Sequence, residues 1–243
     1  MMSRPVRDLG SYAWLRHPPE ILASGCALGA VGAAGGSLGA LVHDPSMPGE
    51  ALALTARHAL VGFGDFVAGT TVLCPAPGDP GCTRIGQTLR ALPLSPEGAG
   101  GSLDAALVRI DRDRAWTARH ALLPGLLGAV RELGVGDVGT ALRKLGCATG
   151  ATAAPLRALS RGVAIALPGS EGKTLVFGTL LEIRPEGEDP WSEAGDSGAL
   201  VLTEAGDPVG LVLAGGTDAQ GPVSYAMPLG PILTALGVTL LGT

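Results

Sequence analysis

Short apolar runs separated by glycine- and proline-rich turns restrict what this chain can fold into. None of the runs is longer than nine residues, which is the length of a strand rather than of a helix. Gly and Pro supply 39 and 19 of the 243 residues, without the period of three that marks collagen. The pattern therefore predicts an all-β fold. The main runs are 38–42, 51–55, 66–73, 105–110, 162–167, 175–183, 199–203, 208–214 and 223–227.

Helical patterns occur in only two segments. Residues 229–236 follow a proline and predict a short C-terminal helix. Residues 122–133 are apolar, but Pro124 and Gly125 interrupt them, so their pattern is ambiguous. This segment and a cluster of charged residues occupy 112–135, which we interpret as a linker near the midpoint of the chain.

An uncharged stretch over 21–42 has two interpretations. Arg4, Arg7 and Arg16 precede it, and this order is typical of a signal peptide or a membrane helix. Six glycines interrupt the stretch, however, and glycine is a poor helix former. We favour two strands joined by a glycine turn over a targeting segment. The prediction is a soluble, cytoplasmic protein with no membrane partner, with secretion as the less favoured alternative.

Composition excludes two further classes. Hydrophobic residues make up 46% of the chain and charged residues 16%, which excludes intrinsic disorder. The net charge is −5, so the chain lacks the basic surface of a nucleic-acid-binding protein. Aromatic residues are only 3%, which leaves few platforms for base stacking. We therefore expect no nucleic-acid partner.

Four cysteines give no support for a metal site, because none belongs to a Cys-x-x-Cys pair. Cys74 and Cys82 flank a loop rich in proline and glycine. A disulfide between them is one alternative, and two free thiols are the simpler expectation for an intracellular protein. Cys26 and Cys147 lie among small apolar residues, and we interpret them as buried packing residues.

Three polar residues lie at the ends of predicted strands. His58 follows one apolar run, Asp104 precedes another, and Ser197 lies in a Gly-Asp-Ser-Gly string before a third. A serine hydroxyl is a weak nucleophile unless a base lies within hydrogen-bond reach. A histidine can take its proton and return it to the leaving group, and an aspartate can hold the imidazole tautomer. The order His, Asp, Ser is that of the chymotrypsin arrangement, unlike subtilisin or the α/β-hydrolases.

The main chain around the serine can also serve this reaction. Backbone N–H groups aimed at one point stabilise the oxyanion of a tetrahedral intermediate, and glycine tolerates the backbone geometry that this demands. We therefore expect the oxyanion hole at Gly195 and Ser197. Each residue alone also has a structural explanation, since Gly-Asp-Ser-Gly is a common turn composition. Their joint occurrence in this order favours catalysis.

The sequence resembles the trypsin-like serine peptidases of chymotrypsin fold, and within them bacterial relatives of the plant narrow-leaf type of trypsin-like protein. The resemblance spans nearly the whole chain. Besides the three motifs above, it is carried by Gly-Ser-Leu-Gly-Ala-Leu-Val at 36–42, by the loop at 73–79, by the turn at 144–150, and by the strands at 209–215 and 223–229.

This resemblance implies two packed six-stranded β-barrels with the active site in the crevice between them. The expected parts are an N-terminal arm over 1–20, a first barrel over 21–122 with the histidine and aspartate, and a second barrel over 123–243 with the serine and the terminal helix. Together they would form one peptidase unit. The implied roles are base for His58, orienting group for Asp104 and nucleophile for Ser197.

The chain departs from the family pattern in the residues flanking the histidine, at Cys147 and at Ala199. None of these changes removes a catalytic group, so they bear on substrate preference more than on reaction type. No Ile-Val or Val-Val start after a basic site occurs near the N-terminus. We therefore expect no zymogen cleavage of the trypsin type, and Asp196 needs another partner.

The substrate-binding residues are predicted from the segments around the serine. Trp191 occupies roughly the place where a trypsin-like pocket needs an acidic residue, and Glu193 is displaced along the loop. Ala214 and Gly215 would form a small, apolar facing wall. We expect a protein or peptide substrate with an apolar or small residue at the cleaved bond.

The sequence thus predicts a serine endopeptidase that acts through an acyl-enzyme and requires no metal and no organic cofactor. An alternative is a latent or inactive module of the same fold that holds a partner peptide in its cleft. An esterase using the same residues is a third, weaker hypothesis. A regulatory or activator protein is a further expected partner class.

Overall fold

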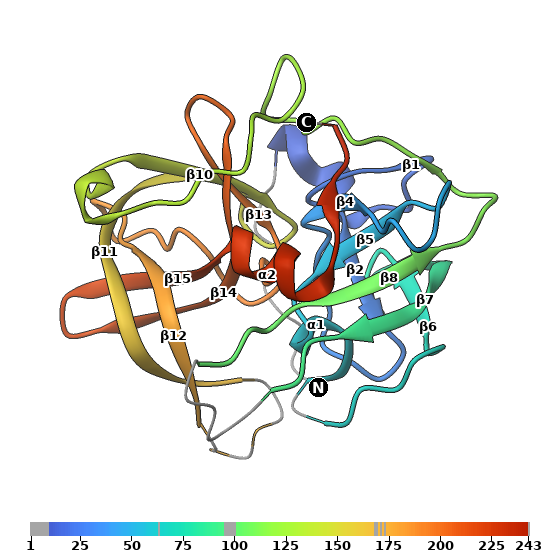
Figure 1. Ribbon diagram of the computed structural model, residues 1–243, viewed down its shortest axis with the longest axis horizontal. Helices are drawn as coiled ribbons and strands as arrows, with labels where there is room; N and C mark the ends of the chain where they lie inside the picture. Colours follow the sequence, from blue (N-terminus) through green and yellow to red (C-terminus); the bar gives the residue numbers. More distant parts are fainter. Residues whose placement is uncertain are drawn as a thin grey trace.

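The computed structural model describes residues 10–62, 64–94, 101–167, 170, 172 and 174–242. Most elements are strands, as the run lengths predict. Within the described residues they form two large curled sheets that lie side by side (Figure 1) and one small two-stranded sheet. The helices are η1 (Gly10–Arg16), α1 (His58–Val61), η2 (Val135–Asp137) and α2 (Leu229–Leu236). The strands are β1 (Ile21–Leu22), β2 (Ala27–Ala30), β3 (Gly36–Ser37), β4 (Ala40–His43), β5 (Leu52–Thr55), β6 (Thr71–Cys74), β7 (Thr83–Ala91), β8 (Ala106–Ile110), β9 (Ala115–Trp116), β10 (Ala141–Gly146), β11 (Gly150–Ala166), β12 (Thr174–Ile183), β13 (Leu200–Thr203), β14 (Pro208–Asp218), β15 (Gly221–Pro228) and β16 (Thr239–Leu240).

The N-terminal sheet has eight strands in the order β16-β4-β5-β8-β7-β6-β2-β3. Its central strand β5 is buried along its whole length and pairs antiparallel with β8, from Leu52↔Arg109 to Thr55↔Ala106. An antiparallel register brings the residues that follow one strand beside those that precede the next. The residues after β5 and before β8 therefore meet, and these include His58 and Asp104.

The C-terminal barrel is closed and has six strands in the order β10-β11-β12-β15-β14-β13. Ser197 lies three residues before β13, which pairs with β14 at Leu200↔Leu211. The carbonyl of Ser197 accepts a hydrogen bond from the Ser37 N–H of the N-terminal sheet at 2.8 Å. This contact places the serine where the two sheets meet.

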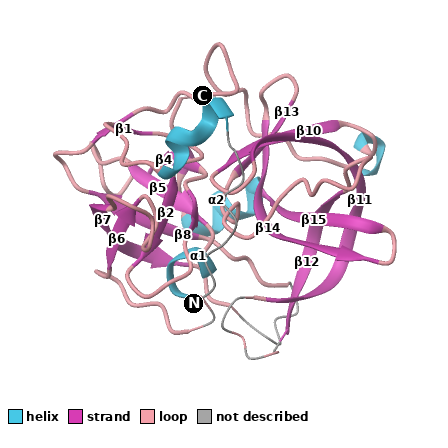
Figure 2. Ribbon diagram, turned by 180° about the vertical axis from the view of Figure 1, so that it is seen from behind, coloured by secondary structure: helices cyan, strands magenta, loops and turns pink. Residues whose placement is uncertain are grey.

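The C-terminal segment ties the two sheets together. Helix α2 lies between them (Figures 1 and 2) and buries Leu229, Ile232, Leu233 and Leu236 on one face, at the spacing of an amphipathic helix. Gly237 ends the helix with a left-handed backbone (φ 66°). Strand β16 then pairs with β4 of the N-terminal sheet, and the core around α2 draws on both sheets.

The predicted all-β, chymotrypsin-like architecture with a terminal helix is confirmed, and the strand count of its first half is corrected. Within the described residues, the C-terminal barrel has the six strands expected, whereas the N-terminal sheet has eight in a row. One of these, β16, comes from the far end of the chain, so no local pattern could assign it to the first half. The domain boundary at residue 122 stays a prediction.

Three segments differ from their sequence interpretation. The stretch 21–42 forms four short strands rather than two, because glycines with positive φ, such as Gly25 and Gly32, interrupt it. The ambiguous segment 122–133 is not helical, and its backbone bonds to residues near the C-terminal barrel instead, as in Gly128 N–H to the Gly206 carbonyl. Part of the predicted arm forms η1, and none of the described helices is long and apolar enough to cross a bilayer.

The structure decides between the two alternatives for the cysteines. All four are free thiols, so the Cys74–Cys82 disulfide is not formed. Cys26 and Cys147 are buried, as their apolar neighbours predict.

Candidate active site

His58 and Asp104 form a buried pair in the N-terminal sheet. The ring Nδ1 of His58 lies 2.5 Å from the Asp104 Oδ2, and the His58 backbone N–H donates to Oδ1 at 2.9 Å. Both residues are nearly inaccessible, with exposed fractions of 3% and 0%. Because the aspartate occupies Nδ1, the other ring nitrogen is left for a different partner. This is the arrangement that the sequence predicted for a base and its orienting group.

The charge of Asp104 is maintained despite its burial. Burial by itself would raise the pKa of this carboxyl group, but attraction to His58 and two hydrogen bonds from it hold the pKa below its ordinary value. Arg57 adds a smaller attraction. On the other side, the Asp104 N–H donates to Met227 Sδ at 3.1 Å, a contact that reaches across to the C-terminal barrel.

Ser197 approaches this pair through its backbone, and its hydroxyl points elsewhere. A side chain at Gly198 would lie 2.7 Å from the Ala56 nitrogen, two residues before His58, so the turn packs directly on the histidine segment. The Ser197 hydroxyl donates to the Leu213 carbonyl at 3.4 Å. Among the described residues no hydrogen bond joins it to His58, which differs from the contact expected of a triad.

The geometry of this hydroxyl has a physical explanation. A buried hydroxyl takes the acceptor within reach, here the Leu213 carbonyl, and a change of the single χ1 angle redirects it. Catalytic hydrogen bonds are also often long or poorly aligned when no substrate is bound. The serine turn therefore packs on the segment that precedes His58, but the hydrogen bond expected between the Ser197 hydroxyl and His58 is not formed within the described residues.

The residues before the serine form a tight turn. The Asp196 N–H donates to the Glu193 carbonyl at 2.9 Å, and Gly195 at the third position has φ 116°. A positive φ at this position is the signature of a type II turn. No hydrogen bond within the described part of the chain uses the N–H of Gly195 or of Ser197 as donor. Within the described residues, two backbone donors at Ser197 and Gly195 are thus left for a ligand.

Asp196 finds its partner in Lys144, a residue that sequence reasoning did not single out. The Lys144 Nζ lies 3.2 Å from the Asp196 Oδ2, and both side chains are fully buried. Lys144 also donates to the Thr149 hydroxyl and lies 5.7 Å from the centre of the Trp191 ring. Asp196 accepts further bonds from Thr149 Oγ1 at 2.7 Å and from the N–H groups of Ala148, Thr149 and Glu193.

Replacing Lys144 by methionine is expected to lower the free energy of unfolding by about 3–5 kcal/mol, because it leaves a buried carboxylate without its cation. The double variant Lys144→Met/Asp196→Asn removes both charges and should recover part of that loss. Urea denaturation of the wild type, both single variants and the double variant measures the coupling. A Lys144→Met variant within 1 kcal/mol of the wild type would contradict this assignment.

The predicted substrate-binding residues are divided between core and surface. Trp191 is 1% exposed and packs in the core of the C-terminal barrel, so it does not offer a surface to substrate as predicted. The ring of Trp191 is large and apolar, so it packs in the barrel core, and it also lies close to the ammonium group of Lys144. These two contacts explain why Trp191 is buried rather than exposed to substrate. Ala214 and Gly215 lie on β14 and are accessible. A side chain at Gly215 would lie 2.4 Å from the carbonyl of Ser192, whose hydroxyl donates to Ser224 at 2.8 Å.

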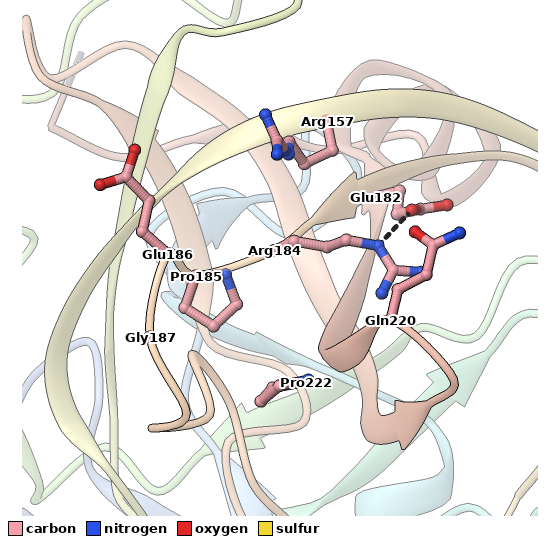
Figure 3. Close-up of a pocket in the computed structure, with 8 residues that line it drawn as sticks. All are labelled: Arg157, Glu182, Arg184, Pro185, Glu186, Gly187, Gln220 and Pro222. Carbon is pink, nitrogen blue, oxygen red and sulfur yellow. Dashed lines mark hydrogen bonds and ion pairs between the residues drawn. The ribbon is translucent and has the colours of Figure 1, made fainter.

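A separate charged groove lies on the C-terminal barrel (Figure 3). It encloses about 390 Å³, and its lining includes Arg157, Glu182 and Arg184. Arg184 is paired with Glu182 at 2.7 Å and with Asp218 at 2.6 Å, so its charge is already compensated. None of the predicted site residues lines the groove, and the described residues contain no cluster of three or more metal-ligating side chains.

Comparisons with known proteins identify the fold. No protein-family model and no curated protein matches the sequence. Among solved structures, Nocardiopsis protease matches with a TM-score of 0.60 at 19% identity, covering 89% of this chain and 97% of that one. Thermobifida fusca protease A gives 0.60 at 18%, covering 90% and 98%. Cellulomonas bogoriensis chymotrypsin gives 0.53 at 22%, covering 85% and 91%. The chain therefore has the chymotrypsin-like fold of serine proteases.

Proposed function

We propose that this protein is a serine peptidase that cleaves its substrate through an acyl-enzyme formed on Ser197. The observation that carries the proposal is the buried His58–Asp104 pair, with a serine turn packed on the segment before His58. Within the described residues, the N–H groups of Gly195 and Ser197 in that turn donate to no acceptor. The fold of the structural neighbours supports it. The closer relation to bacterial relatives of the narrow-leaf type, and the cytoplasmic location, stay predictions from the sequence.

Each residue has a defined step. The Ser197 oxygen attacks the substrate carbonyl while the second ring nitrogen of His58 takes the hydroxyl proton. The charge of Asp104 stabilises the resulting imidazolium and fixes its orientation. The N–H groups of Gly195 and Ser197 bind the oxyanion. His58 then gives its proton to the leaving amine, and water releases the acyl group by the same path.

A peptide substrate can be aligned along β14. Residues 214–218 pair with β15, and of the described strands no other pairs with them, so one edge of β14 is open. An extended peptide can add to such an edge through main-chain hydrogen bonds. The small side chains at this edge support a preference for an apolar or small residue at the cleaved bond, rather than trypsin-like specificity.

The test uses the wild-type chain at pH 8 with a fluorophosphonate probe and a peptide library. We expect a single covalent adduct on Ser197 and cleavage after small or apolar residues. Strict cleavage after Arg or Lys would contradict the proposed preference and leave the peptidase proposal standing. A folded sample that neither reacts with the probe nor cleaves any peptide would contradict the peptidase proposal itself.

A second candidate is a non-catalytic module that binds a peptide along the same edge. The hydroxyl of Ser197, bonded to Leu213 rather than to His58, favours it. Peptide binding that survives Ser197→Ala, together with no turnover in the wild type, would support this candidate over the first.

A further inference from the structure

Ser37, the last residue of β3, contacts the serine turn at two points from the opposite sheet. Its hydroxyl donates to the Gly195 carbonyl at 2.9 Å, and its N–H donates to the Ser197 carbonyl at 2.8 Å. Its side chain is fully buried. We propose that Ser37 is a positioning residue that holds the oxyanion turn in its reactive geometry, an inference that rests on the proposed function.

The Gly195 carbonyl matters because it belongs to the peptide group between Gly195 and Asp196. Holding this carbonyl restricts rotation next to Gly195, whose own N–H is one of the two oxyanion donors. Asp196 restrains the other side of the turn, since its carboxylate accepts the Glu193 N–H at 3.0 Å. The Ser197 carbonyl is the third fixed point. Because these three restraints hold the turn, the N–H of Gly195 keeps its orientation, although it donates to no acceptor within the described residues.

Ser37 also connects the turn to the residues that carry the base. Its carbonyl accepts the Thr55 hydroxyl at 2.8 Å, and Thr55 is the last residue of β5, three positions before His58. A side chain at Gly36 would lie 2.5 Å from the Ser197 carbonyl, so the approach of β3 to the turn is close. One residue of the N-terminal sheet therefore sets the distance between the base segment and the oxyanion turn.

Cys147 supports the same carbonyl more weakly. Its Sγ lies 3.1 Å from the Gly195 carbonyl, and its N–H donates to the Ser37 hydroxyl at 3.0 Å. Burial raises the pKa of the Cys147 thiol to about 12, so it remains an S–H donor at neutral pH. A thiol is a weak donor. The hydroxyl of Ser37 is thus the stronger of the two contacts and the better one to remove.

The test compares Ser37→Ala with Ser37→Thr in the full chain, using a cleaved peptide from the library. We expect Ser37→Ala to lower kcat by about 10- to 100-fold with KM within about threefold, because the lost contact acts on groups that bind the transition state. Ser37→Thr keeps a hydroxyl and should restore most of the rate. A Ser37→Ala variant with unchanged kcat would overturn the proposal.

Thr88→Val is the matched control. The Thr88 hydroxyl is equally buried in the same sheet, donates to the Val67 carbonyl at 2.7 Å and accepts the Thr70 N–H at 2.9 Å, as the Ser37 hydroxyl does with its own partners. Its loss should lower stability without changing kcat. If both variants lower kcat equally, Ser37 has only a structural role and the proposal is overturned.

An activity-independent measurement separates this proposal from the proposed function. In amide NMR spectra, Ser37→Ala should shift the Gly195 and Ser197 signals, whereas Thr88→Val should leave them in place. If these shifts occur in a protein that neither reacts with the fluorophosphonate nor turns over peptide, Ser37 still positions the turn and the peptidase proposal fails. If the signals do not move, the positioning proposal fails whatever the activity.

Discussion

Replacing Ser197 by alanine is expected to lower the rate of peptide hydrolysis by roughly 10⁴- to 10⁶-fold and to abolish labelling by a fluorophosphonate. The change removes the hydroxyl oxygen that the proposed mechanism attaches to the acyl group. The oxyanion donors are backbone groups and remain, so a small residual rate over water should persist. Initial rates with a peptide cleaved by the wild type, measured at saturating concentration, give the loss in kcat.

The fold should survive this change, which makes the loss interpretable. The hydroxyl makes a single long hydrogen bond, to the Leu213 carbonyl at 3.4 Å, so its removal should change the free energy of unfolding by about 1 kcal/mol or less. Ser24→Ala, at another buried serine, is the control and should keep the full rate. A Ser197→Ala variant that retains more than a tenth of the wild-type kcat would mean that another residue is the nucleophile.

The parts of the site that could be predicted are those with a local signature. His58, Asp104 and Ser197 each stand at a strand end with recognisable neighbours, and the pairing of β5 with β8 brings the first two together without any special loop. The backbone of Gly195 follows the same rule, because a glycine at the third position of a turn supplies the positive φ, while its role as an oxyanion donor stays a prediction.

The remaining parts depend on contacts between residues far apart in the sequence. Lys144 resembles any lysine of a strand until Asp196, some 50 positions away, is seen to neutralise it in the core. Ser37 gains its importance from a turn in the other half of the chain. The sequence predicts Trp191 in the pocket because of its position relative to the serine, whereas in the structure its ring lies beside the buried Lys144 and packs in the barrel core.

Asp104→Asn is expected to lower kcat by about 10⁴-fold while leaving KM and the fold nearly unchanged. The carboxylate now accepts both the His58 backbone N–H and the ring Nδ1–H. An asparagine has one oxygen and one NH₂ group, so if the oxygen keeps the backbone bond, the NH₂ group faces the ring. Nδ1 must then be the acceptor, the ring proton moves to the second nitrogen, and that nitrogen can no longer take the serine proton.

The isosteric change also removes the negative charge that stabilises the imidazolium, and the two effects act on the same step. Asp44→Asn separates this from the general cost of losing a buried carboxylate. Asp44 directly follows β4, outside the candidate site, accepts bonds from the Ser46 N–H at 2.8 Å and its hydroxyl at 2.7 Å, and pairs with Arg90 at 2.7 Å. That control should alter stability but not kcat. If Asp104→Asn costs less than tenfold in kcat, the His58 tautomer is not set by this contact, and the pair is structural rather than part of the reaction.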